Sequence, residues 1–252
     1  MKAVILAGGL GTRLKPFTSA IPKPLLPVGE STVLETQITN LAKHGFREIY
    51  LATNYKSEYI QGFLGDGSRL GVNLFWSKET IPLGTCGPIR LLKKHLGEPF
   101  LVLNGDILTS MDFAKFYAFG LAQNVDLAVA TVQVRTPFDF GSVISRNDRI
   151  CQIEEKKDLV TECLAGIYFM TPGIFSHIPR NRYYGMDHLI LDLLNVRHPI
   201  ARYLMKEYWL DIGRIDDYTK AQEAYERHFK SGKVISKRPN KGKSVPLAAK
   251  PA

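Results

Sequence analysis

Short apolar runs alternate with amphipathic stretches along most of the chain. Five runs are rich in Val, Ile, Leu and aromatic residues and are bounded by Gly, Asn or Asp, which predicts buried strands. These strands are expected at Ala3–Ala7, Glu48–Thr53, Phe100–Leu103, Val125–Val134 and Leu164–Met170. Helices are expected at about Val33–His44, Ser57–Leu64, Pro88–Leu96, Asp112–Gln123 and Asp217–Phe229.

The helix expected from Val33 has sequence signals at both ends. Thr32 and Glu35 have the spacing of a capping box, and Gly45 provides a stop. Alternation of strands and helices implies right-handed crossovers. We therefore predict an α/β fold with a three-layer, Rossmann-like, mainly parallel sheet and helices on both faces. Ligands bind such sheets at the carboxyl ends of the strands.

Composition and charge divide the chain into a body and a tail. Of 252 residues, 45% are hydrophobic and 23% charged, which is typical of globular proteins. Residues 231–252 hold six Lys or Arg and no acid. The rest of the chain therefore has 27 basic and 24 acidic residues, which is a net charge of +3 out of the total of +9. We expect one folded domain over 1–230, without a nucleic acid partner, and a disordered basic tail. Contact of the tail with nucleic acid or an anionic membrane remains the alternative.

Targeting signals and cysteine chemistry add little. No apolar run approaches the roughly 18 residues of a membrane span, and Gly8 and Gly9 interrupt the N-terminal run too early for a signal peptide. A cytoplasmic protein is expected. Cys86, Cys151 and Cys163 match neither a disulfide framework nor a zinc site, and Cys86 is interpreted as a packing residue. The six histidines show no metal spacing, so none is assigned a role.

A glycine-rich loop follows the first predicted strand directly. Three glycines in four positions, Gly8 to Gly11, let backbone N–H groups approach phosphates closely. Arg13 adds a planar charge suited to phosphate oxygens. The loop is neither a Rossmann fingerprint, which needs Gly where Leu14 stands, nor a P-loop. A tight turn with a solvated arginine is the alternative.

A lysine lies between two prolines shortly afterwards. Pro22 and Pro24 restrict the backbone around Lys23 to extended conformations and stiffen it. A lone lysine of this kind is usually a surface residue. Its position ten residues after the glycine loop favours a fixed ammonium beside the phosphates.

These motifs closely resemble the sugar-1-phosphate nucleotidylyltransferase family. They are Gly8–Leu14 and Pro22–Pro27, and the resemblance continues through Gly65–Ser68, Leu83–Gly87, Asn104–Asp106, Glu154–Lys156 and Trp209–Gly213. It spans roughly residues 1–225. The resemblance implies a GT-A-like enzyme that joins a nucleoside monophosphate from an NTP to a sugar 1-phosphate and releases pyrophosphate.

The resemblance also implies residue roles. Arg13, Lys23 and Asp106 are expected to be catalytic, and Asp106 and Asp211 to hold Mg²⁺, which prefers hard oxygen ligands. On the residues alone, Asp106 could instead be a turn or capping residue, and Asp211 an exposed acid on an edge strand rather than a buried one. The nucleotide is expected at Leu6, Ala7, Gly8, Gly9, Gly11, Thr12, Arg13, Lys23, Gly84, Thr85, Asn104 and Asp106.

The sugar phosphate is expected on later segments. Arg135–Lys157 is predicted to form a wall for this second substrate, and strand glycines such as Gly166 mark close approach or a simple bulge. The motif register is open by one residue, because Glu154-Glu155-Lys156-Lys157 lacks the frequent proline. The residues that match the family are Gly141, Glu155, Lys156, Gly166 and Asp211.

Substrate identity is the least determined property. The motifs look most like enzymes that use GTP with mannose- or heptose-1-phosphate. Phe63–Arg69 also resembles uridylyltransferases of N-acetylated sugars. A regulatory subunit that binds nucleotide sugars without catalysis is a third reading, and homo-oligomerisation stays open. A glycosyltransferase would need a second acid in Asp106-Ile107-Leu108, which is absent.

Overall fold

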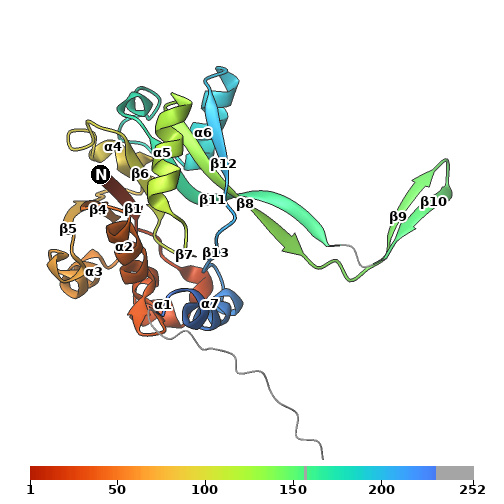
Figure 1. Cartoon of the computed structure of the whole chain (residues 1–252), viewed down its shortest axis with the longest axis horizontal. Coiled ribbons are helices and arrows are strands. Elements are labelled where there is room, and N and C mark those ends of the chain that lie inside the picture. Colours follow the sequence, from red (N-terminus) through yellow and green to blue (C-terminus); the bar gives the residue numbers. More distant parts are fainter. Residues whose placement is uncertain (156–157, 231–252) are drawn as a thin grey trace, which may run out of the picture.

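The computed structural model describes residues 1–155 and 158–230, and a seven-stranded sheet forms its centre (Figure 1). The strand order is β12-β8-β11-β6-β1-β4-β5. Neighbours pair in parallel except β11, which is antiparallel to β6 and β8. In that order the strands are Ile200–Leu204, Leu127–Thr136, Leu159–Met170, Phe100–Asn104, Lys2–Leu6, Glu48–Thr53 and Asn73–Lys78.

Helices cover both faces of this sheet. Successive residues of β1 point to opposite sides, so Ala3 and Ile5 join one apolar core while Val4 joins the other. Helices α2, α3 and α5 pack into the first core, and α4 and α6 into the second. The predicted three-layer α/β architecture is confirmed. These helices are Val33–Lys43, Ser57–Leu64, Phe113–Gln123, Gly87–Leu91 and Met186–Asn195.

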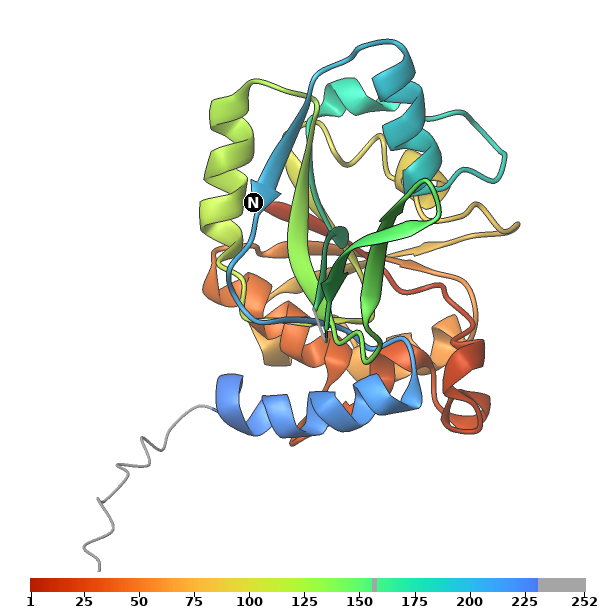
Figure 2. The ribbon, with the colours of Figure 1, turned by 90° about the vertical axis from the view of Figure 1, so that its right-hand side faces the viewer.

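A third, smaller core joins the two ends of the described chain. Helix α7 (Ile215–His228) lies across one end of the sheet in Figure 2 and buries Tyr225 against Leu14, Leu26 and Val28. The same core contains Leu108 from a short strand and Ile212, which directly follows the strand paired with it. The remaining short elements are α1 (Phe17–Ala20), η1 (Thr12–Leu14), η2 (Lys23–Leu25), η3 (Ser68–Leu70), η4 (Pro172–Ser176), β2 (Pro27–Val28), β3 (Ser31–Thr32), β7 (Ile107–Thr109) and β13 (Trp209–Asp211).

Strands β8 and β11 extend beyond their neighbours and form an arm. Figure 1 shows the hairpin of β9 (Ser142–Arg146) and β10 (Arg149–Glu154) at the end of this arm, away from the body. The expected wall over Arg135–Lys157 is not assembled in this arrangement, because the hairpin lies away from the body, and its substrate role stays a prediction. The apolar residues of the hairpin are exposed, Ile150 by 65% and Ile153 by 60%.

Most boundaries of the predicted elements agree to within two residues, and the exceptions are the start of β11, at Leu159 rather than Leu164, and the end of α4. Helix α4 ends at Leu91 rather than Leu96, because i→i+3 turns follow it, such as His95 N to Leu92 O at 2.9 Å. Strands β5 and β12 and helix α6 were not predicted. The capping box of Thr32 and Glu35 is confirmed, with bonds of 2.9 and 3.1 Å. The basic tail and Lys156 lie outside the described residues.

Across the described ranges, no helix has both the length and the apolar character that crossing a membrane requires.

Candidate active site

A pocket of about 640 Å³ lies over the carboxyl ends of β1, β4 and β6. Parallel strands place their following loops at one edge of the sheet, which explains why segments distant in sequence meet there. Gly11, Thr12 and Arg13 are not part of its lining. The predicted nucleotide-binding residues that line it are Leu6, Ala7, Gly8, Gly9, Lys23, Gly84, Thr85, Asn104 and Asp106.

The glycine loop packs directly against the lysine segment. Gly11 has a left-handed φ of 62°, and a Cβ there would lie 2.8 Å from Cγ2 of Thr18 and 3.1 Å from Cβ of Lys23. The hydroxyl of Thr18 donates to the carbonyl of Gly11 at 2.8 Å. Glycine therefore allows a contact between backbone and side chain that brings the two motifs together.

Asp106 is positioned by its neighbours in the turn after β6. Gly105 N donates to Leu6 O at 2.9 Å, and a Cβ on Gly105 would lie only 2.7 Å from the same oxygen. Gln37, buried on α2, donates to the carbonyls of Asn104 and Ile107 at 2.9 and 2.6 Å. Gln37 was not among the predicted site residues. In the sequence, Gln37 could have been noticed as a polar residue next to the apolar positions of a predicted helix.

Lys23 and Asp106 form an ion pair inside the pocket. Their side chains are 11% and 27% exposed. Partial burial strengthens such a pair relative to one at the surface. The cation from the stiff Pro-Lys-Pro segment and the carboxylate after β6 therefore face one another.

Asp211 reaches the same place through the short sheet of β7 and β13. Asp211 lies opposite Ile107 in this antiparallel pair, and Ile212 N donates to Asp106 O at 3.0 Å. The expectation of a buried carboxylate is wrong, because Asp211 is exposed. Surrounding protein still reduces the hydration of the carboxylate, and this loss is the main reason that the pKa of Asp211 is raised. Repulsion from Asp106 raises the pKa further, whereas the charges of Lys23 and Arg13 lower it and offset part of the increase.

Arg13 lies on the Asp211 side of the site. It belongs to η1 and is exposed. A Cβ on Gly213 would lie 3.7 Å from both terminal guanidinium nitrogens of Arg13. The exposed arginine is thus placed beside the loop that follows Asp211.

The two aspartates suit a hard divalent cation. Asp106 and Asp211 place carboxylates close enough for mutual repulsion to affect the pKa of Asp211. Mg²⁺ is commonly held by one or two carboxylates together with substrate phosphates. The donor set therefore fits Mg²⁺, and its two carboxylates come from segments about a hundred residues apart in sequence.

The loop Leu83–Gly87 is fixed to the chain before α6. Tyr184 N donates to Leu83 O at 2.9 Å, and Cys86 N donates to Tyr184 O at 3.0 Å. Gly84 has a φ of 80°, and a Cβ there would lie 2.7 Å from Tyr184 O. Thr85 Oγ1 accepts a bond from Met186 N at 2.8 Å. The loop that lines the pocket is therefore held from outside it.

Cys86 is fully buried within this loop. Loss of hydration raises the pKa of its thiol to about 12. A thiol that stays protonated is a poor nucleophile. Its interpretation as a packing residue is confirmed.

Glu79 is a site residue that the sequence analysis missed. It is buried, its Oε2 accepts from Leu83 N at 2.8 Å, and a Cβ on Gly8 would lie 3.2 Å from its Oε1. Burial raises the pKa of Glu79, although the bond from Leu83 acts in the opposite sense. An acid just after an apolar strand was the available signal. Glu79 links the glycine loop to the Leu83–Gly87 loop.

The residues predicted for the sugar phosphate are only partly assembled. Gly166 has a φ of 68°, and a Cβ there would lie 2.6 Å from Nδ2 of Asn104. The pairing of β11 with β8 also shifts register at this point, so close approach and a bulge occur together. A Cβ on Gly141 would lie 4.0 Å from Cγ of Glu155, so these two residues are neighbours beside the β9–β10 hairpin. Figure 1 shows that hairpin away from β6, the strand that precedes Asp106.

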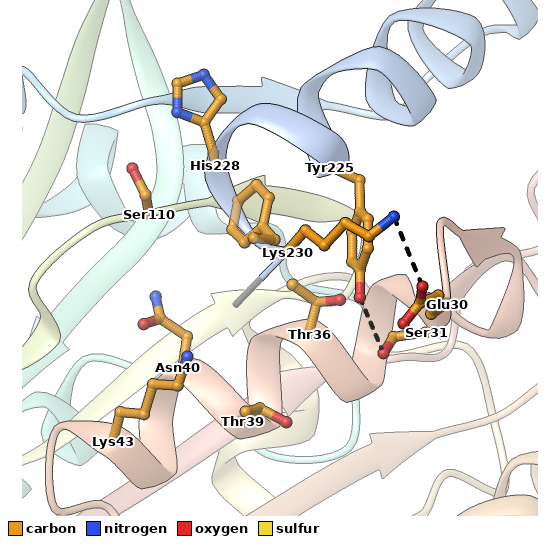
Figure 3. A pocket seen from close by; sticks show the side chains of 11 residues that line it. Glu30, Ser31, Thr36, Thr39, Asn40, Lys43, Ser110, Tyr225, His228 and Lys230 are labelled. Atoms are coloured by element: carbon orange, nitrogen blue, oxygen red, sulfur yellow. Dashed lines mark hydrogen bonds and ion pairs between the residues drawn. The ribbon is translucent and has the colours of Figure 1, made fainter. Parts of the chain in front are cut away.

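A second pocket of about 450 Å³ lies between α2 and α7 (Figure 3). Tyr225 contacts Ser31 at 3.4 Å beside it, and Lys230 pairs with Glu30 at 3.7 Å. None of the predicted site residues lines this pocket. It is separate from the pocket over β1 and β6.

Comparison with known sequences points to one family. The family model described as nucleotidyl transferase matches residues 2–228. A probable mannose-1-phosphate guanylyltransferase 1 of Oryza sativa subsp. japonica is 32% identical over 89% of this chain and 64% of its own length. The mannose-1-phosphate guanylyltransferase catalytic subunit beta of Dictyostelium discoideum is 32% identical over 92% and 66%. The chain thus spans less than two thirds of the length of these relatives.

Solved structures agree. A putative glucose-1-phosphate thymidylyltransferase from Bacillus anthracis has a TM-score of 0.75 at 26% identity, over 92% of this chain and 98% of that one. HddC from Yersinia pseudotuberculosis complexed with GMP-PN has a TM-score of 0.69 at 29% identity, over 89% and 99%. With the glycine loop, the Lys23 segment and the paired aspartates at one edge of a mainly parallel sheet, the chain belongs to the nucleotidyl transferase family.

Proposed function

We propose that the protein transfers a nucleoside monophosphate from an NTP to a sugar 1-phosphate and releases pyrophosphate. The observation that carries this proposal is the pairing of Lys23 with Asp106, in a glycine-lined pocket and close to Asp211. Cations and backbone amides on one side and two carboxylates on the other suit a triphosphate with a divalent ion.

The chemistry needs alignment and charge neutralisation more than a general base. A sugar phosphate oxygen is already ionised at neutral pH and attacks the α-phosphorus in line while pyrophosphate departs. Lys23 would lie over the α-phosphate after it exchanges Asp106 for phosphate oxygens. Arg13 would stabilise the charge that develops on the pyrophosphate. Asp106 and Asp211 would hold a Mg²⁺ ion, which supplies positive charge to the reacting phosphates when bound.

The acceptor side is assigned by the family pattern and by the position of Gly166. Gly166 contacts the Asn104 end of β6, so a sugar phosphate above it would lie beside Asp106. Glu155 and Gly141 would contribute sugar contacts after the hairpin approaches the body. Lys156 would bind the phosphate.

GTP with mannose- or heptose-1-phosphate is the substrate pair that we propose. The guanylyltransferase relatives and the GMP-PN complex of HddC support guanine. The alternative uridylyltransferase reading rested on Phe63–Arg69. None of these residues lines the pocket over β1 and β6, and Arg69 instead pairs with Glu35 at 2.6 Å. That stretch therefore gives no support for uracil.

The test is pyrophosphate release with GTP, UTP, dTTP, CTP and ATP, each crossed with sugar 1-phosphates that include mannose, heptose, glucose and N-acetylglucosamine. We expect Mg²⁺-dependent release that is fastest with GTP and mannose- or heptose-1-phosphate. Release with another pair would correct the substrates and keep the reaction. Tight binding of a nucleotide sugar without release in any combination would favour a regulatory subunit.

A further inference from the structure

Three potential metal ligands meet at the edge of the sheet opposite the candidate active site. Asp126 precedes β8, His198 precedes β12, and His177 follows η4. Strands β8 and β12 are parallel to each other and β11 is antiparallel to β8, so the start of the first two and the end of the third share one edge. The fold thus collects residues that the spacing of histidines in the sequence did not reveal.

The geometry of the cluster fits a single ion. One ligand atom from each of Asp126, His177 and His198 lies within 4.8 Å of the others. Nε2 of His198 is 3.2 Å from Oδ2 of Asp126, and the two imidazole centroids are 4.9 Å apart. Nε2 of His198 is buried, and although Oδ2 of Asp126 lies near it, no group of the described residues meets it with the geometry of a hydrogen bond. A buried polar atom of this kind is costly unless something binds it.

The carboxylate of Asp126 is held in place by other contacts. The hydroxyl of Thr171 donates to Oδ1 of Asp126, and Thr171 N donates to Asp126 O at 3.1 Å. Gly173 leaves room for the carboxylate, because a Cβ there would lie 2.3 Å from Oδ1. These contacts leave Oδ2 directed at His198. Outer contacts that orient a ligating carboxylate are typical of metal sites.

A pocket of about 350 Å³ gives access to the cluster, and Asp126, Thr171 and His198 are in its lining. We propose that Asp126, His177 and His198 form a second metal site, specific for Zn²⁺ or a similar first-row transition metal. Two imidazoles and one carboxylate suit such ions, whereas Mg²⁺ prefers oxygen ligands alone. The pocket leaves space for water or another ligand to complete the coordination. The bound ion would tie together the chain segments before β8, after η4 and before β12.

The competing explanation is an ordinary ion pair between protonated His198 and Asp126. That pair would need no contribution from His177. Substitution of His177 therefore separates the two explanations.

The test is titration of the untagged full chain with Co²⁺ in the presence of excess Mg²⁺, which occupies the oxygen-only site. We expect one Co²⁺ per chain with visible absorption bands of low-symmetry coordination, displaced by Zn²⁺. His177→Ala and His198→Gln should each weaken Co²⁺ binding by at least about tenfold. His95→Ala, at an exposed histidine outside the cluster, and Asp106→Asn should leave it unchanged.

A second readout is independent of absorption. Stoichiometric Zn²⁺ should raise the Tm of the unsubstituted protein and leave that of His177→Ala unchanged. Circular dichroism of each variant without metal establishes whether it folds. If His198→Gln does not fold, the metal binding of His177→Ala and His177→Gln tests the proposed site instead. Absence of stoichiometric uptake, or full uptake by folded His177 variants, would overturn the proposal.

Discussion

The ammonium of Lys23 forms an ion pair with the carboxylate of Asp106, 83 residues further along the chain. The pair joins the side of the site that we propose for phosphates to the side that we propose for Mg²⁺. Each partner has a second candidate ligand, a phosphate for Lys23 and Mg²⁺ for Asp106. In the proposed reaction the binding of nucleotide and metal therefore exchanges one ion pair for two separate interactions.

Asp106→Asn tests the metal assignment. The neutral amide is a weaker ligand for Mg²⁺, so we expect kcat/KM to fall by about 10²–10³-fold while unfolding stays cooperative. Steady-state pyrophosphate release over a Mg²⁺ series measures this. Asp148→Asn, at an exposed aspartate in the hairpin turn, is the matched control and should behave like the unsubstituted protein. Undiminished turnover in Asp106→Asn would exclude the role of this carboxylate.

Arg13→Ala tests stabilisation of the leaving group. The contact of Arg13 should strengthen as pyrophosphate departs, so kcat should fall by about 10²-fold while the KM for NTP changes little. The matched control is Arg227→Ala, an exposed arginine on α7. A variant with normal kcat and a raised KM would contradict the assignment and indicate that Arg13 contributes binding alone.

Asp211→Asn should stabilise the protein while it removes turnover. The raised pKa means that folding disfavours the charged carboxylate. This penalty is fully present above the folded pKa and vanishes below the unfolded value of about 3.9, so the gain in stability should be largest at neutral pH and disappear in acid. Without Mg²⁺, we expect Tm at pH 7 to rise by about 1–2 °C. A lower Tm for the variant at pH 7 would contradict the repulsion between Asp211 and Asp106.

Gly84→Ala tests how the Leu83–Gly87 loop is held. A methyl group there meets Tyr184 O at 2.7 Å on a backbone with φ of 80°. We expect a loss of about 1–3 kcal/mol in the free energy of unfolding and a raised KM for NTP. Gly97→Ala is the control, because a Cβ at Gly97 meets no atom within 4 Å. Equal denaturant midpoints for Gly84→Ala and Gly97→Ala would contradict this prediction, because they would show that the loop around Gly84 accommodates the methyl group without loss of stability.

Cysteine labelling tests the burial of Cys86. A thiol with a pKa of about 12 has almost no thiolate at pH 8, and Cys86 is also inaccessible. Iodoacetamide should therefore modify the exposed Cys151 of the native protein and leave Cys86 intact, as peptide mass spectrometry can show. Modification of both at similar rates would mean that the loop opens frequently. Unfolding in guanidinium should expose Cys86.

Local signals predicted the parts of the site that depend on short stretches of chain. The turn after β1 needs Gly11, the Lys23 segment needs its prolines, and both motifs could be read from adjacent residues. The layers were predicted from the alternation of strands and helices, and the continuous apolar run Ala3–Ile5 agrees with them because it serves two opposite cores. The family resemblance supplied Asp106 and Asp211 as a pair.

Other features depend on tertiary contacts that no local pattern encodes. Gln37 orients the turn before Asp106 from a helix about seventy residues away, and in sequence it is only a polar residue. Asp126, His177 and His198 meet because three strands share an edge. The arm was missed because its apolar residues predict burial, whereas the hairpin leaves them exposed.

The pairing of β13 with β7 sets the order in which the site can be completed during synthesis. The glycine loop, Lys23 and Asp106 are synthesised before Asp211, which stands opposite Ile107 in the β7–β13 pair. The ribosome must therefore release β13 before a folding nascent chain can bring the second carboxylate to the first. A fragment that ends before β13 would lack Asp211, and under the proposed mechanism it should be inactive.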